Sequence, residues 1–235
     1  MLKRKRKQPL QSVARKLVTN VNPKSIVSEQ FRTVRTNINF STPDKELKTL
    51  LFTSSSPGEG KSTSAANVAI VFAQEGKKVL LVDADMRKPT MHYTFNTTNT
   101  TGLSNLLTKQ WSLEEVTKLT KIDGLHLITC GPIPPNPAEL IGSKSMDSLI
   151  DELASQYDLV IFDAPPLLSV TDAQLLSNKC DGTILVINSG VTEKESAMKA
   201  KEALLSAKAN ILGTLMNNFV LEKDHYYYQY YGTGE

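Results

Sequence analysis

Ten consecutive residues of this 235-residue chain combine the glycines and side chains best suited to binding a phosphate. Residues 54–63 read Ser-Ser-Ser-Pro-Gly-Glu-Gly-Lys-Ser-Thr; they follow an apolar run and open a helical pattern. Glycines let the backbone approach a phosphate, and N–H groups at a helix start point at the anion. The lysine reaches the β- and γ-phosphates, and the next hydroxyl binds Mg²⁺. The predicted nucleotide-binding residues are Pro57, Gly58, Glu59, Gly60, Lys61, Ser62 and Thr63.

We call residues 54–63 the phosphate loop, although one position departs from the usual pattern. Ser55 stands where the first glycine is expected, so the match rests on the second half of the motif. The alternative is an ordinary turn rich in glycine and serine. The strand before the loop and the helix after it favour phosphate binding, because this is the context that such a loop requires.

Three aspartates at the ends of apolar runs could complete the site. Asp83 and Asp85 follow one run, and Asp163 ends another. In a parallel sheet, ligands bind at the carboxyl ends of the strands, where carboxylates can hold Mg²⁺ opposite a triphosphate. A single acid after a strand is usually a cap or turn residue. Three of them together with the phosphate loop favour a Mg²⁺ site made of Ser62, Asp83, Asp85 and Asp163.

An amide ends the last apolar run of the chain. Asn217 offers both a donor and an acceptor, so it could pair with the edge of an adenine ring. A plain turn residue is an equally good interpretation of this asparagine.

The strands and helices that position these residues can be predicted from the rest of the sequence, in which apolar runs alternate with helical patterns. Short runs rich in Val, Ile and Leu predict six buried strands. Helical patterns are clearest over Ser62–Gln74, Pro137–Ala154 and Glu193–Ala207, and another near Ser25–Phe40 precedes a break at Ser41–Asp44. This alternation indicates an α/β domain with a mostly parallel sheet covered on both faces. The expected strands are Leu47–Thr53, Lys78–Asp83, Leu125–Thr129, Asp158–Asp163, Gly182–Asn188 and Asn210–Met216.

The composition excludes several classes of protein. Hydrophobic residues make up 40% of the chain and charged residues 22%, which excludes collagen, coiled coil and wholesale disorder. No apolar run approaches the roughly 18 residues that span a bilayer, and no apolar segment of a secretory signal follows the basic start. Cys130 and Cys180 are far apart and form no metal- or redox-type pair. We therefore expect a reduced, cytoplasmic protein.

The formal charge of +3 is unevenly distributed. Eight basic residues occur through Lys24, no acid precedes Glu29, and the remainder carries 19 basic against 24 acidic residues. A mildly acidic body argues against a specific nucleic-acid surface. The basic start is either a solvated arm or a contact for DNA, anionic lipid or an acidic partner. We expect a flexible basic arm over residues 1–24, one domain over 25–220 and a flexible tail over 221–235.

Two segments stand outside the alternation of strands and helices. Phe95–Asn105 is rich in Asn and Thr and predicts an exposed loop. The tail holds five of the chain's seven tyrosines, which either serve as a substrate or pack on the sheet edge. These tail tyrosines are Tyr226, Tyr227, Tyr228, Tyr230 and Tyr231.

Several motifs, taken together, closely resemble one protein family. They are Ser56–Thr63, Asp83-Ala-Asp-Met-Arg87, Phe162-Asp-Ala-Pro-Pro166, Glu29-Gln-Phe-Arg-Thr-Val-Arg35, the proline-rich Gly131–Leu140 and the tyrosine cluster. They resemble the bacterial protein-tyrosine kinases of the capsular and exopolysaccharide co-polymerase system. The likeness covers nearly the whole chain after the basic arm. It is to the Gram-positive type, in which the cytoplasmic kinase is a separate chain from its membrane-spanning activator. The sequence gives no role for residues 131–140, and the alternative for them is a rigid loop leading into a helix.

The resemblance implies a P-loop NTPase-type fold, with a mostly parallel β-sheet sandwiched by helices in a single domain. It also implies an ATP-dependent protein-tyrosine kinase with ATP and Mg²⁺ as cofactors. The loop lysine and serine carry over to Lys61 and Ser62. The aspartates of the second Walker motif correspond to Asp83 and Asp85, and that of the third to Asp163. We assign Asp83 as the base toward the tyrosine hydroxyl, and Arg87 would help to neutralise phosphate charge.

The resemblance also implies how the kinase assembles and what it meets. Glu29, Arg32 and Arg35 would form the interface of a ring-like homo-oligomer, although charge pattern alone favours a solvated helix face. Each subunit would phosphorylate a neighbour's tail tyrosines in trans, and also other proteins. A transmembrane activator would recruit the kinase to the inner face of the cell membrane. A cognate tyrosine phosphatase would reverse the phosphorylation, and the cycle would regulate capsular or exopolysaccharide synthesis.

Two other classes of protein remain as alternatives. The septum-site and plasmid-partition switch ATPases share the superfamily, but they typically carry a signature lysine where this chain has Ser56. A regulatory module that binds nucleotide without chemistry is the weaker alternative, because all three aspartates are present.

Overall fold

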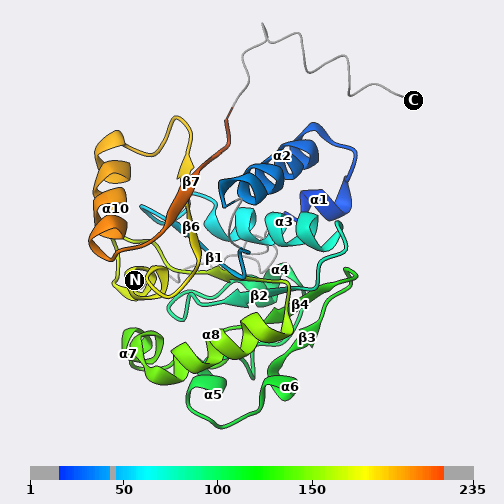
Figure 1. Ribbon diagram of the computed structural model, residues 1–235, viewed down its shortest axis with the longest axis vertical. Coiled ribbons are helices and arrows are strands. Elements are labelled where there is room, and N and C mark those ends of the chain that lie inside the picture. Colours follow the sequence, from blue (N-terminus) through cyan, green and yellow to red (C-terminus); the bar gives the residue numbers. More distant parts are fainter. Residues whose placement is uncertain (1–15, 43–45, 220–235) are drawn as a thin grey trace, which may run out of the picture.

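Runs of Val, Ile and Leu form the strands of a seven-stranded sheet at the centre of the molecule (Figure 1). The structure is a computed structural model that describes residues 16–42 and 46–219. Along the sheet the strand order is β3-β4-β2-β5-β1-β6-β7. The strands are β1 (Thr49–Ser54), β2 (Val79–Asp83), β3 (Lys118–Leu119), β4 (Leu125–Ile128), β5 (Leu159–Asp163), β6 (Gly182–Asn188) and β7 (Ile211–Asn217).

Six of the seven strands are parallel, so their carboxyl ends lie at one edge of the sheet. All six predicted strands are confirmed to within two residues at each end. The missed strand, β3, pairs antiparallel with β4 and is only two residues long, too short for a pattern. In the register, Asp163 lies opposite both Phe52 and Asp83, which brings the ends of β1, β2 and β5 together. We call this side of the sheet the carboxyl edge.

Helices cover both faces, as the alternating pattern predicts (Figure 1). On one face, α3 packs its apolar residues against β1 and β5, and α2 contributes Ile38 to the same core. On the other face, α8 packs Met146 and Leu153 into a second core. The helices are α1 (Val18–Val21), α2 (Ile26–Ser41), α3 (Lys61–Ala73), α4 (Met91–Thr94), α5 (Leu103–Leu107), α6 (Leu113–Val116), α7 (Pro137–Gly142), α8 (Lys144–Gln156), α9 (Asp172–Ser177) and α10 (Lys194–Ser206).

Two predicted segments differ from the structure. The expected helix Pro137–Ala154 is two helices, because Ser143 is extended and its side chain accepts a hydrogen bond from the Met146 N–H at the start of α8. The expected exposed loop Phe95–Asn105 is wrong at its C-terminal end. There, Gly102 and Asn105 are buried, and the Asn105 side chain accepts the Gly102 N–H at 3.0 Å. Asn105 caps the backbone from within the protein. Composition alone does not distinguish an asparagine in this role from one in a solvated loop.

The chain is folded before the end of the predicted basic arm. Helix α1 packs on α3, where the buried Thr19 donates its N–H and its hydroxyl to Asn67 Oδ1 at 3.0 and 2.8 Å. Residues 1–15 of the predicted arm and the whole predicted tail, residues 221–235, lie outside the described residues. Among the described helices, none has the length and apolar character needed to cross a membrane.

Candidate active site

The phosphate loop joins β1 to α3, the context that the sequence predicts. Gly58 and Gly60 have positive φ values of 86° and 97°, a region that favours glycine. A Cβ at Gly60 would lie 2.0 Å from Asn217 Nδ2, so this glycine also allows the end of β7 to approach the loop. The loop is therefore shaped to present backbone N–H groups in front of α3.

The Glu59 side chain turns into the protein, in contrast to its predicted role in binding nucleotide. Its carboxylate accepts the N–H groups of Ser55 and Ser56 at 2.8 and 3.1 Å. It also accepts the hydroxyls of Ser55 and Thr192, both at 2.7 Å. Glu59 is therefore the internal support of the phosphate loop. Thr192, between β6 and α10, was not predicted, and no local pattern marks it.

A second buried carboxylate supports the segment after β2. Asp83 is fully buried; Oδ1 accepts the Asp85 N–H at 3.3 Å, and Oδ2 accepts those of Thr90 and Met91, both at 3.0 Å. Asp83 holds residues 85–91 folded against the carboxyl edge. Asp83 does not line the cavity that opens over the phosphate loop, described below, whereas Asp85 does.

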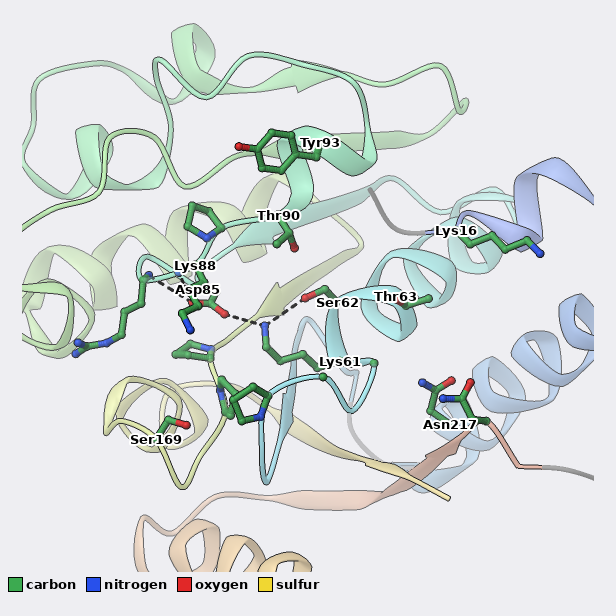
Figure 2. A pocket seen from close by; sticks show the side chains of 18 of the residues that line it. Lys16, Lys61, Ser62, Thr63, Asp85, Lys88, Thr90, Tyr93, Ser169 and Asn217 are labelled. Atoms are coloured by element: carbon green, nitrogen blue, oxygen red, sulfur yellow. Dashed lines mark hydrogen bonds and ion pairs between the residues drawn. The ribbon is translucent and has the colours of Figure 1, made fainter. Parts of the chain in front are cut away.

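Lys61 connects the phosphate loop to two of the three predicted aspartates, and Figure 2 shows its contacts with Asp85 and Ser62. Its ammonium lies 3.0 Å from Asp85 Oδ2, 3.2 Å from Asp163 Oδ1 and 3.2 Å from Ser62 Oγ. Only 12% of the Lys61 side chain is exposed, and Asp163 is completely buried. The strand ends thus bring Lys61, Ser62, Asp83, Asp85 and Asp163 together, as predicted.

Burial and mutual repulsion change the acidity of this cluster. Burial raises the pKa of Asp83 to about 8, and the charge of Asp163 adds to the rise. Burial also raises the pKa of Asp163, against the attraction of Lys61 and the Ser62 hydroxyl. For Lys61, burial disfavours the charge, but Asp163 and Asp85 outweigh it and its pKa is raised. The Lys61 ammonium therefore does not fully offset the burial and repulsion of Asp83 and Asp163, and a further cation would stabilise their charged forms.

The donor set fits a magnesium ion that shares its ligands with a nucleotide. In the described ranges, no group of three His, Cys, Asp or Glu side chains is arranged to enclose a metal by itself. Mg²⁺ commonly takes only one or two carboxylates, with phosphate oxygens and waters completing the octahedron. Asp163 Oδ2 is buried and accepts no well-formed hydrogen bond from the residues that the structure describes, although the Ser62 hydroxyl lies close to that carboxylate and lowers its pKa. Ser62, Asp85 and Asp163 therefore offer oxygen ligands on the correct side of the phosphate loop.

A cavity of about 1000 Å³ opens over this cluster. In Figure 2, Lys61 and Ser62 lie near its middle, Lys16 and Asn217 on one side, and Lys88 and Tyr93 on the other. Asn217 donates its Nδ2–H to Glu59 O at 3.1 Å, so part of its amide already serves the loop. The cavity is lined by Pro57, Gly58, Gly60, Lys61, Ser62, Thr63, Asp85, Arg87 and Asn217 among others, which include most of the predicted nucleotide-binding residues.

Arg87 lines the cavity, but its guanidinium is already paired. It donates to both oxygens of the buried Asp172, from Nε at 2.9 Å and from Nη2 at 3.0 Å. The Asp172 hydrogen bonds raise the pKa of Arg87 further. This pair fixes the segment after β2 to α9 and leaves less of the Arg87 charge for a phosphate. Asp172 was not predicted, because a partner 85 residues away leaves no local signal.

The predicted interface residues on α2 do not form one free face. Arg35 donates from Nη1 to Val71 O at 2.8 Å, and its Nε lies 3.5 Å from Glu75 Oε1, so it ties α2 to the end of α3. Arg32 forms an ion pair with Glu29 and donates to Pro23 O at 2.9 Å. Glu29 and Arg32 therefore lie at the surface, whereas Arg35 has a role within the subunit.

Comparisons with known proteins agree with this geometry. Residues 47–211 match the family model described as an AAA domain. The tyrosine-protein kinase YwqD of Bacillus subtilis (strain 168) is 54% identical over 219 residues, covering 93% of this chain and 92% of that relative. The crystal structure of the chimerical protein CapA2B2 superposes with a TM-score of 0.84 at 44% identity, over 88% of this chain and 93% of the other.

More distant structures separate fold from family. The kinase domain of the Escherichia coli tyrosine kinase ETK gives a TM-score of 0.85 at 31% identity, covering 94% of this chain and 85% of that domain. A septum site-determining protein from Pyrococcus horikoshii OT3, in complex with Mg-ADP, is only 23% identical with a TM-score of 0.63, which shows a shared fold alone. The phosphate loop, the aspartates at the strand ends and these relatives agree: the chain belongs to the bacterial protein-tyrosine kinases.

Proposed function

We propose that this protein-tyrosine kinase transfers the γ-phosphoryl group of ATP to the tyrosine cluster of a neighbouring copy. The acceptors would be Tyr226, Tyr227, Tyr228, Tyr230 and Tyr231. The observation that carries the proposal is the position of Asn217. It lines the same cavity as Lys61 and Asp85, and the tyrosine cluster begins nine residues later.

The position of Asn217 also favours transfer in trans. Asn217 lies on one side of Lys61, and Asp85 with Lys88 and Tyr93 lies on the other (Figure 2). The tail of the same chain would have to cross over the nucleotide to reach the acceptor side. A neighbour's tail can enter from the open side, so a second copy is the better donor of tyrosine.

The residues present suit a transfer in which positioning and charge stabilisation dominate. The N–H groups of the phosphate loop and the Lys61 ammonium would bind the phosphates, and Asn217 would meet the adenine. Mg²⁺, held by Ser62, Asp85 and Asp163, would supply neutralising charge when bound. A phenol has a pKa of about 10, so a nearby carboxylate is a sufficient base.

We assign the role of base to Asp85 rather than to Asp83, the residue that the sequence favoured. The Asp83 carboxylate is fully buried, supports the backbone after β2 and does not line the cavity, so it does not face an acceptor. Asp85 lines the cavity beside Lys61. Asp83 then acts as a positioning residue for the segment that carries Asp85.

The test of transfer in trans mixes two variants. One chain carries Lys61→Met with an intact tail, and the other is active but has its five tail tyrosines replaced by Phe. We expect phosphotyrosine on the Lys61→Met chain. If none forms in a mixture that is folded and associated, the transfer in trans is wrong. A phosphate-release assay on the same samples separates kinase from simple ATPase activity.

Membership of the family supports a wider proposal about partners. We propose that the kinase is cytoplasmic and that a transmembrane activator recruits it to the inner face of the membrane. There it would phosphorylate other proteins and so regulate capsular or exopolysaccharide synthesis. A tyrosine phosphatase would remove the phosphates from the kinase. Membrane fractionation with and without the activator gene tests the recruitment. Unchanged fractionation after the deletion contradicts it.

For the assembly, we propose a ring-like homo-oligomer in which Glu29 and Arg32 contact the neighbouring subunit. Because Arg35 bonds to Val71 O and pairs with Glu75, only Arg32→Ala should change the assembled mass without destabilising the subunit. Light scattering on Arg32→Ala and Arg35→Ala, with urea unfolding of each, separates the two effects. An unchanged mass for Arg32→Ala rules out this interface.

A further inference from the structure

A nucleotide bound between the phosphate loop and Asn217 would leave open the part of the cavity on the other side of Lys61. Lys88 and Tyr93, from the segment after β2, lie on that side (Figure 2). Pro165, Pro166 and Val170, from the segment after β5, line the same cavity. We call this group of five residues the acceptor end. Asp85 lines the cavity too and contacts Lys61.

The cations around the cavity differ in how far they are already neutralised. Lys61 is shared between Asp85 and Asp163, and Arg87 is bound by both oxygens of Asp172. Lys88 is exposed, and in the described part of the chain its ammonium forms no ion pair or hydrogen bond. At the acceptor end, Lys88 is therefore the positive charge available to a ligand.

We propose that the acceptor end selects tyrosines that follow acidic residues, and that Lys88 contacts the acidic side chain. The inference rests on the proposed transfer to a neighbour's tail and specifies how that tail is recognised. Without Lys88, the charged groups that line this part of the cavity would be Asp85 and the cations Lys61 and Arg87, which are already paired with aspartates. The unpaired Lys88 charge is therefore what favours an acidic peptide here.

The charge of the tail matches this assignment. Residues 220–235 contain three acidic residues and one lysine. Two of the acids, Glu222 and Asp224, precede Tyr226 by four and two residues. In an extended peptide, residues two apart point to the same side, so both acids and Tyr226 can face one surface. The tail thus brings acid and acceptor to the cavity together.

The apolar members of the acceptor end suit the ring of a tyrosine. Pro165, Pro166, Val170 and the Tyr93 ring, which is 37% exposed, line the cavity. Aromatic rings pack well on such surfaces, in offset or edge-to-face geometry. An acceptor ring packed on these side chains would direct its hydroxyl toward Asp85, while the preceding acids would extend toward Lys88.

The test compares two peptides with the full-length kinase. One peptide copies residues 220–231 with Tyr226 as its sole tyrosine, the other four being Phe; the second adds Glu222→Lys and Asp224→Lys. Both are assayed with a kinase whose own tail tyrosines are Phe, under conditions in which the unaltered chain autophosphorylates. The measured quantity is the ratio of kcat/KM for the acidic over the lysine peptide, which cancels any general change in activity.

For the unaltered Lys88, we expect kcat/KM to be about fivefold higher for the acidic peptide for each ion pair that forms. In Lys88→Glu the preference should reverse, with the change mainly in KM. Lys201→Glu makes the same change of charge on an exposed lysine of α10 away from the cavity, and it should keep the ratio of the unaltered kinase.

Three outcomes overturn the inference. Equal kcat/KM for the two peptides shows that the acids are not recognised. An unchanged ratio in Lys88→Glu assigns the recognition to other residues. A kinase that modifies neither peptide has no open acceptor end. Transfer in trans to the Lys61→Met chain is scored separately, so the proposed function can stand when the recognition by Lys88 fails.

Discussion

Two segments at the carboxyl edge are built in the same way and differ in what surrounds them. The phosphate loop folds around Glu59, and residues 85–91 fold around Asp83; each carboxylate faces inward and accepts several hydrogen bonds. Glu59 takes two N–H groups and two hydroxyls, whereas Asp83 takes three N–H groups. In both segments, an inward-facing carboxylate thus supports the backbone beside the cavity.

The difference lies in the charges nearby. Asp83 lies opposite Asp163 in the sheet, and its pKa is raised to about 8 by burial and by that carboxyl group. The oxygens of Glu59 are bonded to neutral backbone and hydroxyl groups. The loop that binds phosphate is therefore supported by neutral partners, and the segment that carries Asp85 is supported by an acid that responds to the catalytic charges.

The largest effect should come from removing the contact between the two segments. Lys61→Met removes the ammonium that bridges Asp85 and Asp163, as well as the charge offered to the phosphates. We expect transfer to fall by about 10²- to 10³-fold or more, because charge stabilisation carries most of this chemistry. Phosphotyrosine blots of the folded variant measure it, with Lys199→Met on α10 as the control. Undiminished phosphotyrosine in folded Lys61→Met would falsify the site assignment.

The next effect distinguishes the aspartate in the cavity from the one beneath it. Asp85→Asn should lower kcat by about a hundredfold with the backbone of residues 85–91 in place. Asp83→Asn should also lower activity, but by loosening this segment, since an amide nitrogen cannot accept the N–H groups that both carboxylate oxygens now accept. Hydrogen exchange of the Thr90 and Met91 amides separates the two routes. Equal protection in both variants would contradict the supporting role of Asp83.

How far these roles could be predicted depended on the range of the interaction. Buried parallel strands give continuous apolar runs, so β1, β2 and β5, and hence the meeting of Lys61 with Asp163, followed from local pattern. The partners that orient the side chains of the site could not be predicted from local pattern. Arg87 and Asp172 are 85 residues apart, and Glu59 and Thr192 are 133 apart. Nor could the sequence tell that Asp83 turns inward while Asp85 reaches the cavity, because both simply follow the same strand.

A third effect is on the pH dependence of stability. Without Mg²⁺ and nucleotide, folded Asp83 binds its proton up to about pH 8, whereas the unfolded chain releases it near pH 4. The folded state therefore holds more protons in that window, and stability should fall as pH rises through it, by on the order of a few kcal/mol. Urea unfolding in a chelator at pH 5 and pH 8 measures the slope.

Asp83→Asn is the control for this slope, because it removes the titrating group and should flatten the dependence. Asp163, whose pKa is also raised, should retain part of it. A slope that is as steep in Asp83→Asn as in the unaltered chain would assign the titration to another group.

The smallest effect sharpens the comparison between the two supporting acids. In Glu59→Gln, the amide oxygen can accept the N–H groups of Ser55 and Ser56, and the amide nitrogen can donate to the hydroxyls of Ser55 and Thr192, which reverse their roles. We expect a loss of stability below about 1 kcal/mol and little change in nucleotide affinity. Glu59→Ala instead leaves the buried Ser55 N–H unpaired, at about 1–3 kcal/mol, together with the partly buried Ser56 N–H, and should weaken nucleotide binding. Asp83 has only N–H partners, which cannot reverse, so Asp83→Asn should be the more damaging amide substitution. Calorimetric titration with ADP and urea unfolding of all three variants test the order. If Glu59→Gln were as damaging as Glu59→Ala, the charge of Glu59 rather than its hydrogen bonds would support the loop, and the two segments would depend on the same electrostatics.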